Sequence, residues 1–305
     1  MASRSLVSRD TDSSDVPGKC TVSGIAESCH RQDPFRLLRP SMGYPVVLIH
    51  GMWCSSGSWN RVREILESRG YDCYVPSLPA HDAVPDQPLQ VARLSLRDYL
   101  DALEQFVAQI PDTRPPIVIG HSMGGLLAQQ LAMRVAPLAM VLLTPAPSWG
   151  IMGLRWSNFV AFARWMFSGR FWRNPYKPSF ERAVISAFNG LAPDRHRRLY
   201  EGLLHESGRA IFEIAFWWID FGRAALVRSA DIHCPVYVVN CGQDRLTPAS
   251  VVRRVAARYP QSTQRSYPDR GHWVIDDEET EEMMHAICGW LRPIEQRFAR
   301  QHHAA

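Results

Sequence analysis

The stretch from Pro115 to Leu131, PPIVIGHSMGGLLAQQL, constrains the fold of this chain more than any other segment. Ile117–Ile119 is a short β-branched apolar run, which is typical of a buried strand. Gly-His-Ser-Met-Gly follows at once, and an apolar helical pattern then runs without a breaker as far as Pro137. A strand, a sharp turn and a helix in this order place Ser122 at the apex of the turn, with its hydroxyl above the sheet.

The pentapeptide alone is weak evidence, because its three fixed positions arise by chance in about one chain in ten of this length. A serine hydroxyl also needs a base within hydrogen-bond reach, and that base needs an acid to orient it. Downstream, the apolar run Val236–Val239 leads into a turn that carries Asp244, and a later loop, PDRGHW, carries His272. The order serine, acid, histidine is the one that a strand–turn–helix nucleophile requires.

Other assignments of the acid are weaker. The loop after Leu143 reads Thr-Pro-Ala and contains no carboxylate, and Asp231 precedes its strand instead of following it. Hydrolysis through a tetrahedral intermediate also needs two backbone N–H donors for the oxyanion. We expect these from Met123, directly after the nucleophile, and from Met52 in the loop HGMW that follows the apolar run Pro45–Ile49.

Apolar strand patterns alternate with helical patterns along most of the chain. Strands are expected at 45–49, 71–75, 117–119, 138–143, 235–239 and 264–267, with helices at 59–69, 94–110, 249–259 and 278–291. Because the strands are almost wholly apolar, the pattern predicts a parallel sheet covered by helices on both faces. Two further strands are expected less clearly at Cys20–Ala26 and Phe35–Leu38.

Together, the segments VVLIHGMW, GHSMGG, GQDRLTP and DRGHW resemble the α/β-hydrolase superfamily over about residues 44–292. The resemblance implies a mostly parallel, doubly wound eight-stranded sheet with a helical cap inserted after the sixth strand, and a catalytic triad of Ser122, His272 and Asp244. The implied organisation is an N-terminal extension at 1–42, a core at 43–144 and 232–295, a cap at 145–231, and a tail at 296–305. The hairpin that usually precedes the HG strand is not evident in residues 1–42.

The expected cap is unusually aromatic and contains six of the ten tryptophans. Trp53 and Trp273, each beside a catalytic loop, and Trp149 at the start of the cap are candidate walls of a pocket for an apolar group. Between residues 151 and 182, six basic residues face one acid, Glu181, and they alternate with aromatic residues. Such a stretch suits either an ordinary cap helix with one buried face or peripheral contact with an anionic membrane.

Composition limits the partners, the cellular compartment and the cofactors that we expect for this protein. A net charge of +4 without a long basic block argues against a nucleic-acid partner. Seven cysteines without a C-x-x-C pair are typical of a reducing compartment, and the N-terminus lacks the apolar core of a secretory signal, so we expect a cytoplasmic protein. No metal-binding cluster or phosphate-binding loop is recognisable, and no cofactor is expected.

These patterns predict a serine hydrolase of the esterase or lipase type that cleaves a small carboxylic ester with a hydrophobic acyl or alcohol group. The same machinery serves thioesterases, lactonases and acyltransferases, and the sequence does not separate them. A non-catalytic ligand-binding protein that keeps the fold remains the rival hypothesis.

Overall fold

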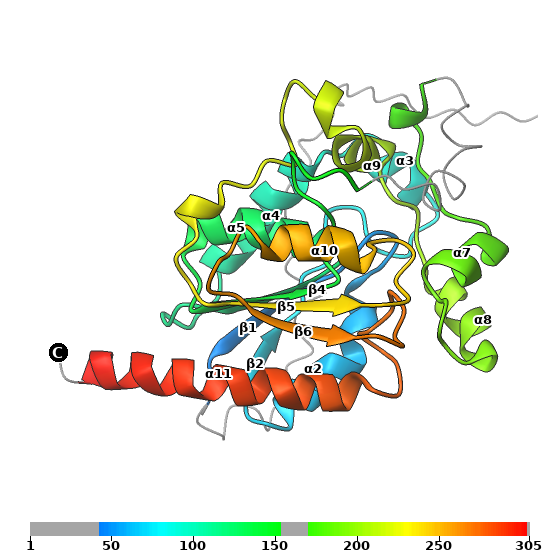
Figure 1. Cartoon of the computed structure of the whole chain (residues 1–305). Helices are drawn as coiled ribbons and strands as arrows, with labels where there is room; N and C mark the ends of the chain where they lie inside the picture. Colours follow the sequence, from blue (N-terminus) through cyan, green and yellow to red (C-terminus); the bar gives the residue numbers. More distant parts are fainter. Residues whose placement is uncertain (1–42, 154–169, 304–305) are drawn as a thin grey trace, which may run out of the picture. The chain divides into compact units, whose positions relative to one another are not determined.

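A computed structural model describes residues 43–153 and 170–303 of the chain (Figure 1). The strands expected at Cys20–Ala26 and Phe35–Leu38, and the whole expected N-terminal extension, lie outside the described residues. Residues 154–169 of the expected cap lie outside them as well.

The described residues form a six-stranded, all-parallel sheet, as the alternating pattern predicts. Its strand order is β2-β1-β3-β4-β5-β6. After β1, the chain adds β2 at one edge of the sheet, returns to the other side of β1 with β3, and then adds β4, β5 and β6 in sequence order. The strands are β1 (Pro45–Ile49), β2 (Asp72–Tyr74), β3 (Ile117–His121), β4 (Ala139–Leu143), β5 (Val236–Cys241) and β6 (Thr263–Tyr267).

Alternate side chains of each strand enter two separate hydrophobic cores, one on each face of the sheet. In β1, Val46 and Leu48 pack with helices α2 (Asn60–Glu67) and α11 (Thr280–His303), whereas Val47 and Ile49 pack on the other face. That other face is covered by α4 (Leu96–Ala108), α5 (Met123–Val135) and α10 (Ala249–Ala256), as Figure 1 shows. The sheet is therefore doubly wound, which explains why its strands read as continuous apolar runs.

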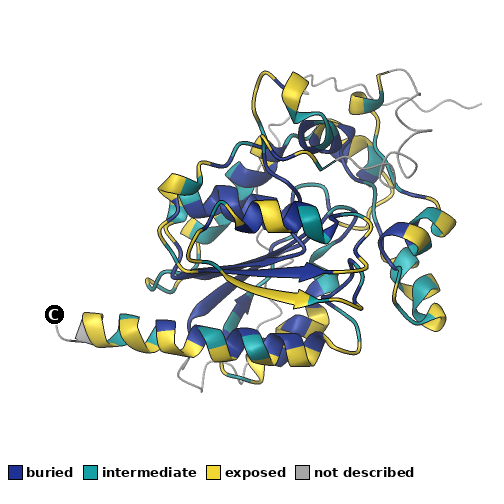
Figure 2. Cartoon of the chain, in the orientation of Figure 1, coloured by how far each residue is buried: buried dark blue, intermediate teal, exposed yellow. Residues whose placement is uncertain are grey.

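The edge strand β6 departs from this apolar rule. Its residues are Thr-Gln-Arg-Ser-Tyr, four of them exposed, and Figure 2 shows it in yellow beside the dark blue central strands. Polar and charged side chains on an edge strand hinder pairing with another chain. Cys54, Cys73 and Cys241 are buried as free thiols, and burial raises the pKa of Cys54 to about 12.

Between β4 and β5 the chain leaves the sheet and forms short helices. These are η3 (Phe171–Arg173), α7 (Phe180–Ser186), α8 (Pro193–Glu201), α9 (Gly208–Ala215), η4 (Trp217–Ile219) and η5 (Ser229–Asp231). The remaining short elements, η2 (Ser56–Trp59) and α3 (Gln87–Val91), lie in the loops after β1 and β2. Several contacts hold the inserted segment over the loops that follow the strands, including a 2.7 Å hydrogen bond from Asn189 Nδ2 to the Gln243 carbonyl oxygen.

The last helix is longer than expected. The expected end at Leu291 is wrong, because α11 continues through Pro293 to His303. Proline removes one backbone hydrogen bond inside a helix, but this helix is held by packing beyond that point. The Tyr71 hydroxyl donates to Glu295 Oε1 over 2.7 Å, and the Tyr44 ring packs edge-on against Phe298 with centroids 5.9 Å apart.

Candidate active site

Ser122 lies at the turn between β3 and α5, with a φ of 55° and a ψ of −120°. Glycines stand two residues before and two residues after Ser122, because neither position has room for a side chain. A Cβ on Gly120 would lie 2.2 Å from the Gly124 carbonyl oxygen, and one on Gly124 would lie 2.1 Å from the Ile49 carbonyl oxygen. The two glycine positions of the pentapeptide are therefore explained by close backbone packing, within the turn at Gly120 and against β1 at Gly124.

Asp244 follows β5 and His272 follows β6, so the two adjacent strands bring them together. His272 Nδ1 lies 2.8 Å from Asp244 Oδ2, and both side chains are almost fully buried. Because a carboxylate only accepts hydrogen bonds, Nδ1 carries the proton and Nε2 is left as the basic nitrogen. The other carboxylate oxygen, Oδ1, accepts the backbone N–H groups of Leu246 (2.9 Å) and Thr247 (2.8 Å), which fix the orientation of the acid.

Thr247 is a residue of the site that the sequence analysis missed. Its hydroxyl oxygen lies 2.8 Å from Asp244 Oδ2, 3.2 Å from His272 Nδ1 and 2.9 Å from the carbonyl oxygen of Thr144. The available signal was its spacing, since a threonine three residues after an aspartate in a turn can hydrogen-bond back to it. Thr247, which contacts both Asp244 and His272, lines the same cavity as Ser122.

The loop after β1 passes next to the nucleophile. A Cβ on Gly51 would lie 3.0 Å from the Cβ of Ser122, and Met52 borders the same cavity. Within residues 43–153 and 170–303, the backbone N–H groups of Met52 and Met123 donate to no acceptor. The two donors expected for an oxyanion are thus available on either side of Ser122.

Behind this loop lies a buried polar network. His50 Nε2 accepts the Leu78 N–H over 3.1 Å, and Nδ1–H donates to the Gly51 carbonyl oxygen over 2.9 Å. The ring of His50 is 5.0 Å from that of His81, which contacts Glu206 in the inserted segment. Burial, with the adjacent His81 as a smaller cause, lowers the pKa of His50 to about 3, so His50 is a neutral support of the loop.

Trp53 connects the same loop to the inserted segment. Its carbonyl oxygen accepts the Leu204 N–H over 2.7 Å, and its indole N–H donates to the Tyr176 carbonyl oxygen over 3.0 Å. Tyr176 in turn forms an antiparallel bridge with Glu206. Trp53 adopts a φ of 64°, which is uncommon for a large side chain and is held by these contacts.

The cavity beside Ser122 has a volume of about 80 Å³ and a largely apolar wall. Trp53 borders it, as expected, together with Ile211 and Ile214 of α9. The other two expected pocket residues do not border it in the described part of the chain. Trp149 packs instead against Trp217, with ring centroids 5.1 Å apart, and lies under the Arg223 guanidinium.

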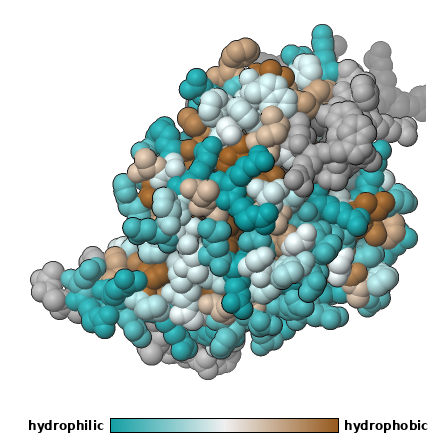
Figure 3. Space-filling view, in the orientation of Figure 1, coloured by the Kyte–Doolittle hydropathy of each residue, from teal (hydrophilic) through white to brown (hydrophobic). Residues whose placement is uncertain are grey.

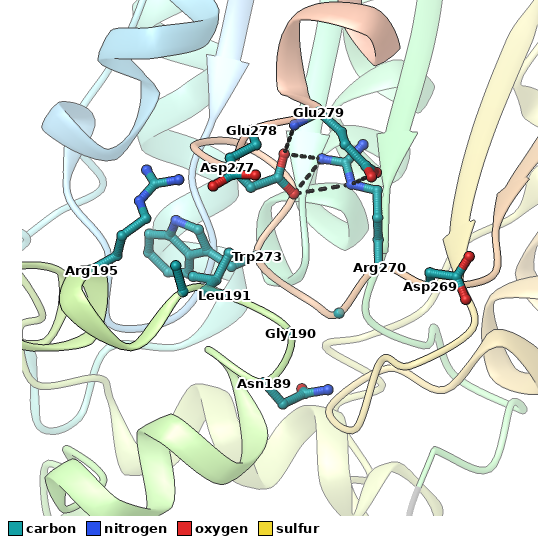
Figure 4. A pocket seen from close by; sticks show the side chains of 12 residues that line it. Asn189, Gly190, Leu191, Arg195, Asp269, Arg270, Trp273, Asp277, Glu278 and Glu279 are labelled. Carbon is teal, nitrogen blue, oxygen red and sulfur yellow. Dashed lines mark hydrogen bonds and ion pairs between the residues drawn. The ribbon is translucent and has the colours of Figure 1, made fainter.

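Trp273 borders a different cleft, of about 350 Å³, on the outer side of the His272 loop (Figure 4). Its ring packs edge-on against Phe188, with centroids 5.2 Å apart, and Figure 4 shows it beside Arg195 and Leu191. The His272 side chain points toward Asp244, whereas the side chain of the next residue, Trp273, borders this second cleft. The cleft also contains the buried ion pair between Arg270 and Asp277.

His121, next to Ser122, is a structural histidine. Its ring is fully buried, and Nε2 donates to the carbonyl oxygen of His272 over 3.0 Å. Burial first, and the neighbouring His272 second, lower the pKa of His121 to about 3. His121 therefore supports the backbone at His272 in its neutral form. Among the described residues, no group of three or more His, Cys, Asp or Glu side chains is arranged to hold a metal ion.

Comparison with known proteins agrees with this geometry. Residues 46–286 match the alpha/beta hydrolase family, and the chain belongs to that family. It is 26% identical over 236 residues to the pimeloyl-[acyl-carrier protein] methyl ester esterase of Chromobacterium violaceum, an alignment that covers 75% of this chain and 87% of that protein.

A second curated relative carries a different description. The chain is 26% identical over 270 residues to the magnesium-chelatase 30 kDa subunit of Rhodobacter capsulatus, covering 83% of this chain and 88% of that protein. Among solved structures, a methylesterase from Arabidopsis superposes with a TM-score of 0.62 and 14% identity over 82% of this chain and 99% of its own. The fold is thus that of an alpha/beta hydrolase, and esterases are among its relatives.

Proposed function

We propose that this protein is a serine esterase that cleaves a carboxylic ester carrying a hydrophobic acyl or alcohol group. The observation that carries the proposal is the 2.8 Å contact between His272 Nδ1 and Asp244 Oδ2 beside a serine held at a positive-φ turn. The apolar wall of the adjoining cavity supports a hydrophobic substrate. The esterase among the curated relatives supports hydrolysis of an ester bond.

In the proposed reaction, His272 Nε2 takes the proton of the Ser122 hydroxyl as its oxygen attacks the ester carbonyl carbon. The Met52 and Met123 N–H groups hold the negative oxygen of the tetrahedral intermediate. The intermediate collapses when the bond to the alcohol oxygen breaks and His272 returns the proton to that oxygen. A water molecule, deprotonated by His272, then attacks the acyl-enzyme, and Ser122 and the free acid are released.

The decisive experiment measures hydrolysis of p-nitrophenyl esters from acetate to palmitate, and of methyl esters of the same acids, by wild type and Ser122→Ala. We expect turnover that the substitution lowers by about 10³-fold or more, and a chain-length optimum set by the apolar cavity. Labelling of the wild type, but not of Ser122→Ala, by a fluorophosphonate probe is the independent readout of an activated serine.

The alternatives make different predictions for the same samples. Labelling without ester turnover indicates a thioesterase, lactonase or acyltransferase that uses the same serine. Neither labelling nor turnover, in a folded protein, contradicts the esterase proposal and favours a non-catalytic ligand-binding role.

A further inference from the structure

Aromatic side chains of the inserted segment reach the molecular surface together. Trp172 and Trp218 are 37% and 43% exposed, Ile219 is 47% exposed and Phe221 is 97% exposed. Phe171 and Phe216 join these residues through ring contacts, with centroids 5.2 Å apart for Phe171–Trp172, 5.7 Å for Phe171–Phe216 and 5.4 Å for Phe216–Trp218. We call these six residues the aromatic surface.

Figure 3 shows hydrophobic side chains at the upper end of the molecule, where Figure 1 places α9 and the segment after it. Single exposed apolar residues are ordinary on a soluble protein, but a contiguous group of large ones marks an interaction surface. Phe221 is the most exposed of these side chains, so binding of a partner there could remove almost its entire side chain from water.

The charges around the aromatic surface are positive. Arg170 and Arg173 flank Phe171 and Trp172, and Arg223 follows Phe221; all three arginines are exposed. The acids of the same region are withdrawn from the surface. Asp220 is buried and accepts the Gly222 and Ala224 N–H groups, and the buried Glu213 is paired with Arg209.

Tryptophan and phenylalanine beside exposed arginines are the side chains that suit the boundary between lipid headgroups and acyl chains. No helix of the described residues is long and apolar enough to cross a bilayer. We propose that the aromatic surface docks on an anionic phospholipid membrane, with the rings in the interface and the three arginines on lipid phosphates.

The position of α9 links this surface to the cavity. Ile211, Ile214 and Ala215 border the cavity beside Ser122, whereas Phe212 and Phe216 pack with the aromatic surface on another side of the same helix. A hydrophobic ester dissolved in the membrane would therefore be concentrated beside the helix that also borders the cavity at Ser122. This last step rests on the proposed esterase function, but membrane docking does not.

Vesicle co-sedimentation tests the docking without any catalysis. The full chain, wild type and Ser122→Ala, is mixed with vesicles of phosphatidylcholine and phosphatidylglycerol, and with vesicles of phosphatidylcholine alone. Both proteins are expected to bind the anionic vesicles more tightly, and 0.5 M salt is expected to weaken that binding. Arg173→Gln should weaken it about fivefold, the effect of one basic residue at an anionic surface.

Trp218→Ser combined with Phe221→Ser is expected to weaken binding by tenfold or more. The matched control is Ile185→Ser, which removes a 59% exposed apolar side chain from α7, outside the aromatic surface. Circular dichroism reports that each variant is folded, and short-chain ester hydrolysis without vesicles adds a second readout for the variants that keep Ser122.

Three outcomes overturn the proposal. They are absence of binding to anionic vesicles at low salt, equal loss of binding in the control and the double variant, and a concentration-dependent dimer that the double variant abolishes. The last result would assign the aromatic surface to a second copy of the chain. A membrane-bound protein that hydrolyses nothing would contradict the esterase proposal and leave docking intact.

Discussion

His81 Nε2 donates a hydrogen bond to Glu206 Oε2 over 3.2 Å, and neither side chain has any solvent exposure. Burial lowers the pKa of His81, but the Glu206 carboxylate and its hydrogen bond, together with the Pro79 carbonyl and Asp82, raise it above its ordinary value. Glu206 Oε1 also accepts the Tyr99 hydroxyl and the Ser207 N–H, each over 2.7 Å. The inserted segment is thus attached to the core by a fully hydrogen-bonded buried ion pair.

Glu206→Gln should lower the free energy of unfolding by about 3 kcal/mol, because breaking a buried pair leaves the other charge uncompensated. Since the pKa of His81 is raised, the contribution of the pair is fully present below pH ~6.5 and is lost as the pH rises through the folded pKa. Urea denaturation at pH 6 and pH 9 checks this, and the gap from wild type should be larger at pH 6. The control is Arg61→Ala, which breaks an exposed pair with Glu281 and should change stability by less than about 1 kcal/mol.

Thr247→Val should lower kcat about tenfold with little change in KM, because it removes a hydroxyl that contacts both Asp244 and His272. Thr247→Ser, which keeps the hydroxyl, should restore most of the rate. Steady-state kinetics over pH 5–9 on one soluble ester gives both constants. Equal losses in the valine and serine variants would show that packing, and not the hydroxyl, matters at this position.

Gly124→Ala should prevent the nucleophile turn from forming, since its Cβ would lie 2.1 Å from a carbonyl oxygen of β1. We expect little folded protein, measured as soluble yield and thermal unfolding. Gly289→Ala is the matched control in the interior of α11, where an added Cβ meets no atom within 4 Å. That variant should be more stable than wild type by up to about 1 kcal/mol. Two variants of equal stability would contradict the packing argument.

Acidification should destabilise the protein in part through His121. The unfolded chain takes up a proton on this residue near pH 6.5, whereas the folded protein does so only at about 3. Between these values the histidine lowers the free energy of unfolding by about 1.4 kcal/mol for each pH unit of acidification. His121→Gln keeps an N–H donor for the His272 carbonyl and should flatten the slope measured by urea denaturation at pH 7, 6 and 5. An unchanged slope would contradict the assignment.

The sheet was predictable because its signal is local. Apolar runs such as Val46–Ile49 and Ile117–Ile119 need no knowledge of distant residues to read as buried strands. Ser122, Asp244 and His272 were also predictable as candidates, since each directly follows a strand and the carboxyl ends of parallel strands meet at one edge.

Contacts between segments far apart in the sequence were not predictable. Glu206, for example, pairs with His81, which lies 125 residues away in the sequence. Among the described residues, Trp149 and Trp273 do not border the cavity beside Ser122, because proximity in sequence to a loop does not fix where a side chain points. The end of α11 was misplaced because Pro293 is a strong local signal, and the packing that overrides it comes from Tyr44 and Tyr71.

Trp53 determines how the protein can be re-engineered. Its carbonyl oxygen and its indole N–H hold two different stretches of the inserted segment, at Leu204 and Tyr176, while its neighbour Met52 borders the cavity beside Ser122. A cap grafted from another hydrolase onto this core would lose both hydrogen bonds and release the loop next to the nucleophile. Successful chimaeras should therefore exchange the loop after β1 together with the cap, as a single module.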